Sequence, residues 1–86
     1  MERINIEITK ESGDILIKND QGGEFRIPDS NKELRASETL NFLNYNENKY
    51  YVLKELDESV KNDKNIQYVY KIFEEIIEKI NPEIEE

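Results

Sequence analysis

The chain has no histidine, no cysteine and no tryptophan, and only three glycines and two prolines among its 86 residues. Without histidine and cysteine it lacks the commonest general base, the thiol nucleophile and the soft ligands of zinc sites. The absence of cysteine also excludes a disulfide-stabilised secreted scaffold. No imidazole is present to activate a serine hydroxyl as a nucleophile. We therefore expect a protein that is not an enzyme and that holds neither a metal ion nor a cofactor.

Long apolar runs are absent as well, because no stretch approaches the roughly 20 residues that a membrane-spanning helix requires. The chain opens on a strand pattern rather than on a signal peptide, so we expect a cytoplasmic protein. Asp and Glu outnumber Lys and Arg by 20 to 12, which gives a net charge of -8. A surface of this charge repels nucleic acid and anionic membranes, since binding to phosphates requires clustered Lys and Arg. Neither is expected as a direct partner, which leaves another protein.

The first third of the chain alternates between apolar and polar residues, which indicates half-buried strands. The alternation covers residues 3–9, 15–17 and 24–28, with turn residues at 10–14 and 19–23. This pattern predicts an antiparallel three-stranded meander with one apolar face. The residues expected on that face are Ile4, Ile6, Ile8, Ile15, Ile17, Phe25 and Ile27. Those expected on the opposite face are Arg3, Asn5, Glu7, Lys18, Glu24 and Arg26.

The segment 19–24 is the nearest approach to a metal-binding or phosphate-binding loop, because it combines oxygen ligands with two glycines. It lacks both the Lys-Ser/Thr pair of a phosphate loop and the carboxylate spacing of a calcium hand. We interpret it as a hairpin turn.

A short helix is expected after the third strand. Ser30 followed by Glu33 fits a capping box, which predicts a helix start at Ser30, and Ser37 is a second candidate start. Asn41 and Asn44 weaken the helix, since their amides compete for backbone partners.

Residues 49–61 fit two structures. Tyr50, Leu53 and Leu56 have the spacing of one face of a helix, whereas the run of two tyrosines, valine and leucine at 50–53 has strand propensity. The helix is favoured here, with Tyr50 facing the core and Tyr51 pointing elsewhere.

The last helix is the clearest one. Asn62, Asp63 and Asn65 mark a turn and an N-cap, and Asn81-Pro82 ends the helix. One apolar stripe follows the helical period and contains Ile66, Val69, Phe73, Ile76, Ile77 and Ile80. The predicted fold class is therefore α+β: an N-terminal three-stranded antiparallel meander packed on two or three C-terminal helices. We expect one domain over residues 1–81 and an acidic tail at 82–86.

Two sets of residues on this helix are left over from the core. Tyr68 and Ile72 lie side by side at i and i+4, and Glu74, Glu75 and Glu78 are the acids of the outer face. We expect these residues to contact a partner. The hypothesis is a small acidic regulator or inhibitor that docks on a larger protein, its carboxylates replacing the phosphates of nucleic acid. Proteins of phages and mobile elements that block nucleic-acid enzymes have similar size and charge. The alternative is a homo-oligomeric assembly protein, such as a homodimer, that uses a strand edge or the face bearing Tyr68 and Ile72.

Overall fold

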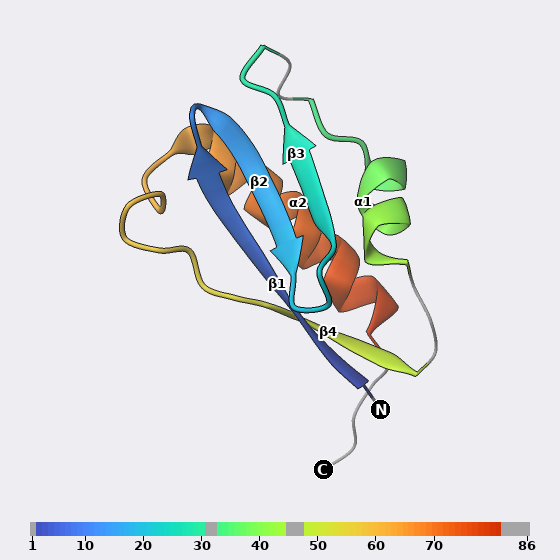
Figure 1. Cartoon of the computed structure of the whole chain (residues 1–86). Helices are drawn as coiled ribbons and strands as arrows, with labels where there is room; N and C mark the ends of the chain where they lie inside the picture. The colour runs from blue at the N-terminus through green and yellow to red at the C-terminus, as the bar shows by residue number, and fades with distance from the viewer. Residues whose placement is uncertain (1, 31–32, 45–47, 82–86) are drawn as a thin grey trace.

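The computed structural model describes residues 2–30, 33–44 and 48–81. These residues form a four-stranded mixed sheet and two helices. In chain order the elements are β1 (Glu2–Glu11), β2 (Asp14–Asn19), β3 (Glu24–Ile27), α1 (Ala36–Leu43), β4 (Lys49–Leu53) and α2 (Lys64–Ile80). The strand order is β3-β2-β1-β4, and in Figure 1 α2 crosses behind the sheet while α1 lies beside β3. The expected α+β class is confirmed, with the sheet larger than predicted.

The antiparallel meander of β1, β2 and β3 is confirmed. Ser12 and Gly13 join β1 to β2 with φ angles of 52° and 87°, as in the two-residue turns that match strand twist. Asn19 organises the second turn, since its Oδ1 accepts hydrogen bonds from the backbone N–H of Gln21 at 3.0 Å and Gly23 at 2.7 Å. A Cβ on Gly23 would lie 2.5 Å from the Asn19 amide nitrogen, so this close approach requires glycine. The segment 19–24 thus contains a hairpin turn.

The core lies between the sheet and the helices. The six isoleucines predicted for the inner face of the meander are each at most 3% exposed, whereas Phe25 on edge strand β3 is only half-buried. Phe42 of α1 bridges Phe25 and Phe73 of α2, with ring centroids 6.1 and 6.4 Å apart. Buried residues from both helices and the loops complete this cluster, among them Leu34, Leu43, Val60, Ile66, Val69 and Ile77. The predicted apolar stripe of α2 is therefore its core face.

The favoured helix at 49–61 is wrong. Residues 49–53 form β4, which pairs in parallel with β1 and places Tyr51 opposite Ile4. Strand alternation reverses the expected roles: Tyr51 is 2% exposed in the core, and Tyr50 lies on the outer face with the Arg3 guanidinium 5.7 Å from its ring centroid. The strand is preferred because β1 offers a backbone edge that a parallel neighbour satisfies, and aromatic and β-branched residues suit that position.

The predicted start of the first helix at Ser30 is also wrong. Helix α1 begins at Ala36, after Arg35 in extended conformation, and the Arg35 backbone N–H donates to Glu38 Oε2 at 3.2 Å. The chain remains non-helical at Leu34, whose side chain is buried in the core. The alternative start at Ser37 misses the first helical residue by one position. Asn44 ends the helix in the left-handed conformation with φ of 51°, which asparagine tolerates well.

Helix α2 begins and ends as predicted. Asp63 is its N-cap, and Asn81 follows its last residue. The acidic tail expected at 82–86 lies outside the described residues. In the described part of the chain, neither helix combines the length and the apolar character needed to cross a bilayer.

Tyr51 connects the ends of both helices to the sheet. Its hydroxyl donates to the carbonyl oxygen of Leu43 at 2.8 Å and lies 3.2 Å from that of Asn44, at the end of α1. Its backbone N–H donates to Asn81 Oδ1 at 2.8 Å, and its carbonyl accepts from Asn81 Nδ2 at 2.8 Å. One buried residue therefore holds three elements together.

Tyr51→Phe is expected to lower the free energy of unfolding by about 1–3 kcal/mol, because helix-end carbonyls lose a buried donor. Urea titration followed by circular dichroism measures the loss. Tyr50→Phe is the matched control, since within the described residues the Tyr50 hydroxyl has no hydrogen bond, and it should change stability by less than about 0.5 kcal/mol. Equal losses of stability in the two variants would show that the hydrogen bonds of the Tyr51 hydroxyl do not stabilise the fold.

Asp63 provides a second, pH-dependent test. Its carboxylate lies 2.6 Å from Lys10 Nζ and accepts from the backbone N–H of Asn65 and Ile66. The Lys10 hydrogen bond, followed by those backbone bonds, lowers the pKa of Asp63 below its usual range. A lowered folded-state pKa stabilises the fold above the unfolded pKa of about 4, and this contribution is lost as pH falls through the folded value.

Asp63→Ala is therefore expected to cost about 0.5–2 kcal/mol at neutral pH, as the loss of an N-cap does. The difference from wild type should shrink as pH falls below about 4, because protonation removes the same interactions. Urea titrations at neutral and acidic pH measure both values. A difference between Asp63→Ala and wild type that stays constant over this pH range would contradict the account.

Candidate functional site

The outer side of α2 carries the residues expected to contact a partner. Tyr68 is 56% exposed and, with Leu40, is one of two large apolar side chains classed as exposed among the described residues. Ile72 packs against the core and is half-buried. Ile72 therefore belongs partly to the core. Of the predicted apolar pair, Tyr68 is the residue that is exposed to solvent.

The predicted carboxylates do not form one patch with Tyr68. At about 100° per residue, Glu75 lies about 20° from Tyr68 around the helix, whereas Glu74 and Glu78 lie about 120° and 80° away. All three carboxylates are exposed. The helix thus brings Tyr68, Ile72 and Glu75 together and directs Glu74 toward another side, with Glu78 between the two.

That other side is centred on Tyr70, which is half-buried. Burial raises the pKa of Tyr70, and the carboxylates of Glu74 and Glu55 raise it further. Glu55 belongs to the loop after β4, so the loop and the helix each contribute a carboxylate that affects the same tyrosine. Glu78 lies one turn beyond Glu74 on the helix. We call Glu55, Tyr70, Glu74 and Glu78 the Tyr70 surface.

The sequence did not predict that Glu55 affects the pKa of Tyr70. It placed Glu55 on a helix over residues 49–61, where the position of its side chain relative to α2 could not be derived. Within residues 2–30, 33–44 and 48–81, neither Glu55, Glu74 nor Glu78 forms an ion pair with a lysine or arginine. Their charges are therefore available to an outside cation.

The net charge of α2 alone does not explain why the Tyr70 surface is acidic. The helix contains three glutamates and three lysines, so it is neutral overall. By helical geometry, Lys64 and Lys79 lie within about 40° of Tyr68, whereas Lys71 lies about 60° from Glu74 and about 20° from Glu78. The Tyr68 side is thus mixed in charge, and the Tyr70 surface owes its excess of acids to Glu55, which the loop after β4 adds to the helix.

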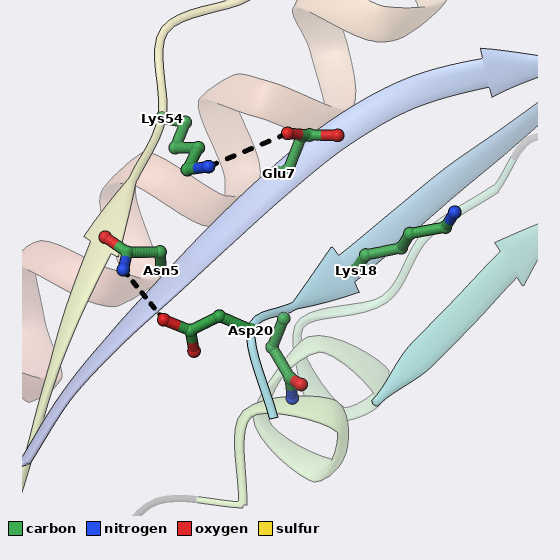
Figure 2. A pocket seen from close by; sticks show the side chains of 6 residues that line it. Asn5, Glu7, Lys18, Asp20 and Lys54 are labelled. Atoms are coloured by element: carbon green, nitrogen blue, oxygen red, sulfur yellow. Dashed lines mark hydrogen bonds and ion pairs between the residues drawn. The ribbon is translucent and has the colours of Figure 1, made fainter. Parts of the chain in front are cut away.

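The open face of the sheet contains a depression of about 210 Å³. Asn5, Glu7, Lys18, Asn19, Asp20 and Lys54 line it, as Figure 2 shows. Its polar groups satisfy one another: Lys54 Nζ lies 3.8 Å from Glu7 Oε2, and Asn5 Nδ2 donates to Asp20 Oδ2 at 2.7 Å. Lys18 faces Glu7 in the strand register. This balance of charge makes the depression a poor site for a strongly charged ligand.

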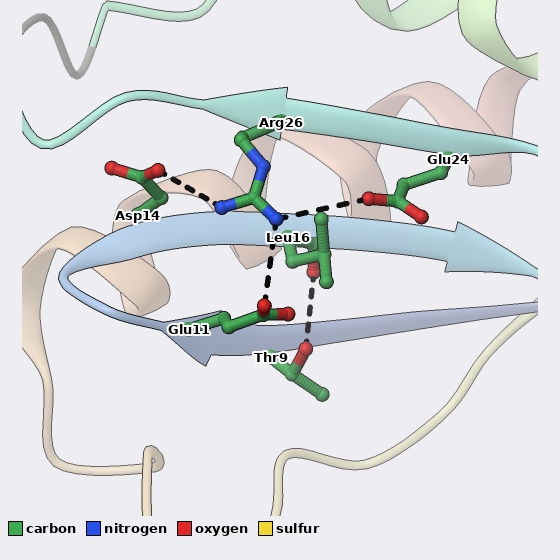
Figure 3. A network of polar contacts seen from close by, with 6 residues as sticks. All are labelled: Thr9, Glu11, Asp14, Leu16, Glu24 and Arg26. Carbon is green, nitrogen blue, oxygen red and sulfur yellow. Dashed lines mark hydrogen bonds and ion pairs between the residues drawn. The ribbon is translucent and has the colours of Figure 1, made fainter.

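Arg26 balances the other half of the open face. Its guanidinium lies 2.9 Å from Asp14, 3.7 Å from Glu11 and 3.9 Å from Glu24 (Figure 3). The register places Leu16 between Arg26 and Thr9, which explains why Leu16 is only 2% exposed on a face open to solvent. Before the structure, an apolar residue at an outward position was the one indication of this burial.

No group of three or more acidic side chains that could hold a metal ion is found among the described residues. Comparisons of the chain with protein-family models, curated proteins and solved structures found no match. Within the part of the chain that the structure describes, the most distinctive feature of the two sides of α2 is the set of carboxylates on the Tyr70 surface, which form no ion pair there.

Glu55→Gln is expected to lower the pKa of Tyr70, because a neutral amide no longer opposes formation of the phenolate. Tyrosine ring resonances followed by NMR from neutral to alkaline pH measure this change. Glu75→Gln removes the same charge from the Tyr68 side and should leave the Tyr70 pKa nearly unchanged. Equal shifts in the two variants would mean that the pKa of Tyr70 responds to the total charge alone. Glu55 and Tyr70 would then not belong to one local surface.

Proposed function

We propose that this chain is a small acidic regulator or inhibitor that docks on a larger, nucleic-acid-binding protein through the Tyr70 surface. The observation that supports the proposal is that Glu74 of α2 and Glu55 of the loop after β4 form no ion pair within the described residues and add to burial in raising the pKa of Tyr70. Glu78 extends the row along α2, and all three carboxylates are exposed. In this role they take the place of phosphates in a basic groove of the partner.

The physical basis is charge complementarity. Exposed acids that form no ion pair attract a basic groove, and such a groove is the usual feature of a protein that binds nucleic acid. Charge of this kind mainly speeds and orients association and is screened by salt, with a Debye length of about 8 Å at physiological ionic strength. Tyr70 supplies an aromatic centre, a residue type that is enriched among the strongest contributors to interfaces.

Self-assembly is the second candidate function. The observation that favours it is the exposure of Tyr68, at 56%, beside the half-buried Ile72. Lys64, Lys79 and Glu75 surround that position on the helix, so two copies could pair opposite charges across a twofold axis. Tyr68→Lys tests this route without disturbing the core, to which Ile72 contributes.

The main experiment starts with the chain as bait for capture from its native host, with bound proteins identified by mass spectrometry. The affinity of the recovered partner is then measured from low to high salt, with and without competing DNA or RNA. Glu55→Gln/Glu74→Gln/Glu78→Gln should weaken binding by about tenfold or more, as the loss of about 1.4 kcal/mol does. Binding should fall steeply with salt, and nucleic acid should compete.

A matched control removes three acids from the open sheet face: Glu7→Gln/Glu11→Gln/Glu24→Gln. It changes the net charge equally, so it should weaken binding far less if the Tyr70 surface makes the contact. Equal losses, a flat salt response or a lack of competition would contradict the proposal. If wild type sediments as a dimer that Tyr68→Lys dissociates, self-assembly is the better account.

A further inference from the structure

Strand β4 lies at an edge of the sheet, and no strand among the described residues covers its outer side. Toward β1, the Glu2 N–H donates to the Asn48 carbonyl at 2.7 Å and the Lys54 N–H donates to that of Ile6 at 2.9 Å. Backbone groups of successive residues in a strand point alternately to its two sides. The N–H and C=O groups of Lys49, Tyr51 and Leu53 therefore point to the outer edge.

Among residues 2–30, 33–44 and 48–81, the one group that bonds to this outer edge is a side chain, and it bonds to the central residue, Tyr51. The amide of Asn81 accepts from the Tyr51 N–H and donates to the Tyr51 carbonyl, both at 2.8 Å. These are the donor and the acceptor that one residue of a neighbouring strand would supply. Asn81 is fixed in place at the end of α2, where its own N–H donates to the Ile77 carbonyl at 2.9 Å.

The two edges of the sheet differ in their protection. Edge strand β3 carries charges at Glu24 and Arg26 and is followed by Pro28, features that discourage pairing with another chain. Strand β4, with the sequence KYYVL, has one charge and no proline. Its sequence alone would make it a template for strand addition, so its protection must come from outside the strand.

We propose that Asn81 is an edge plug, which prevents β4 from pairing antiparallel with β4 of a second copy of this chain. In that pairing, centred on Tyr51, Lys49 of each copy lies opposite Leu53 of the other, so no like charges meet. The open backbone groups of Lys49 and Leu53 would then be satisfied as well. The second copy is the occupant that the strand fits best, because its edge supplies the same five-residue pattern. This inference does not depend on the proposed function.

The test is Asn81→Ala, examined by sedimentation velocity over about a hundredfold range of concentration. Wild type should not associate through β4, whereas Asn81→Ala should form a dimer that grows with concentration. Asn65→Ala, at an exposed position of the same helix, is the matched control and should behave as wild type. Adding Lys49→Pro to Asn81→Ala removes an outward donor at the strand end, where proline is tolerated, and should weaken the dimer.

An Asn81→Ala variant that is folded by circular dichroism and shows no added association over the range would overturn the proposal. Should that variant fail to fold, amide hydrogen exchange in wild type decides. The Tyr51 amide should exchange at least about tenfold more slowly than that of Leu53, because Asn81 closes it locally. Equal exchange of the two amides, or a wild-type dimer that protects Leu53, would show that Asn81 does not plug the edge.

Discussion

The burial of Tyr51 is the constraint on which the other elements depend. A hydroxyl in a core costs free energy unless it is hydrogen-bonded, and the last carbonyls of a helix lack partners within the helix. Tyr51 and the end of α1 satisfy both needs through the bond to the Leu43 carbonyl. The backbone of the same residue holds Asn81 at the end of α2, while its register with Ile4 fixes β4 on β1. The two helices are thereby placed relative to the sheet through one side chain and one peptide segment.

The position of β4 also determines where the acidic surface forms. Because β4 pairs in parallel with the first half of β1, the chain leaves the sheet after Leu53 and swings out in a wide loop to the start of α2 (Figure 1), where Asp63 pairs with Lys10 of β1. Glu55 lies at the start of this path, close enough to Tyr70 to raise its pKa together with Glu74. The open sheet face, by contrast, pairs its acids with Arg26 and Lys54. Three carboxylates that form no ion pair within the described residues, those of Glu55, Glu74 and Glu78, therefore lie away from the open sheet face.

The local pattern of apolar residues was sufficient to predict a strand or a helix wherever it had a single clear period. Strict alternation from Ile4 to Ile8 predicted β1 and its inner face, and the apolar stripe through Phe73, with Asp63 before it, predicted α2. The run at 50–53 fits both a strand and a helix, the helix was favoured, and only pairing with β1, a contact distant in sequence, decided for the strand. The predicted start of α1 was wrong for a similar reason, since the burial of Leu34 outweighed the capping signal at Ser30. Among the candidate site residues, the exposure of Tyr68 followed from helix geometry, whereas the approach of Glu55 to Tyr70 depended on the misassigned segment.

The central claim, that Tyr51 lies in the core on a strand parallel to β1, is tested most directly by NMR in solution. The account predicts nuclear Overhauser effects between the backbones of Ile4 and Tyr51, and between the Tyr51 ring and the residues at the end of α1. It also predicts strong sequential contacts from each α-proton to the next amide across residues 49–53, as extended strands give. A succession of amide-to-amide contacts through residues 50–60, together with contacts from residue i to i+3, would indicate a helix there and would contradict the account.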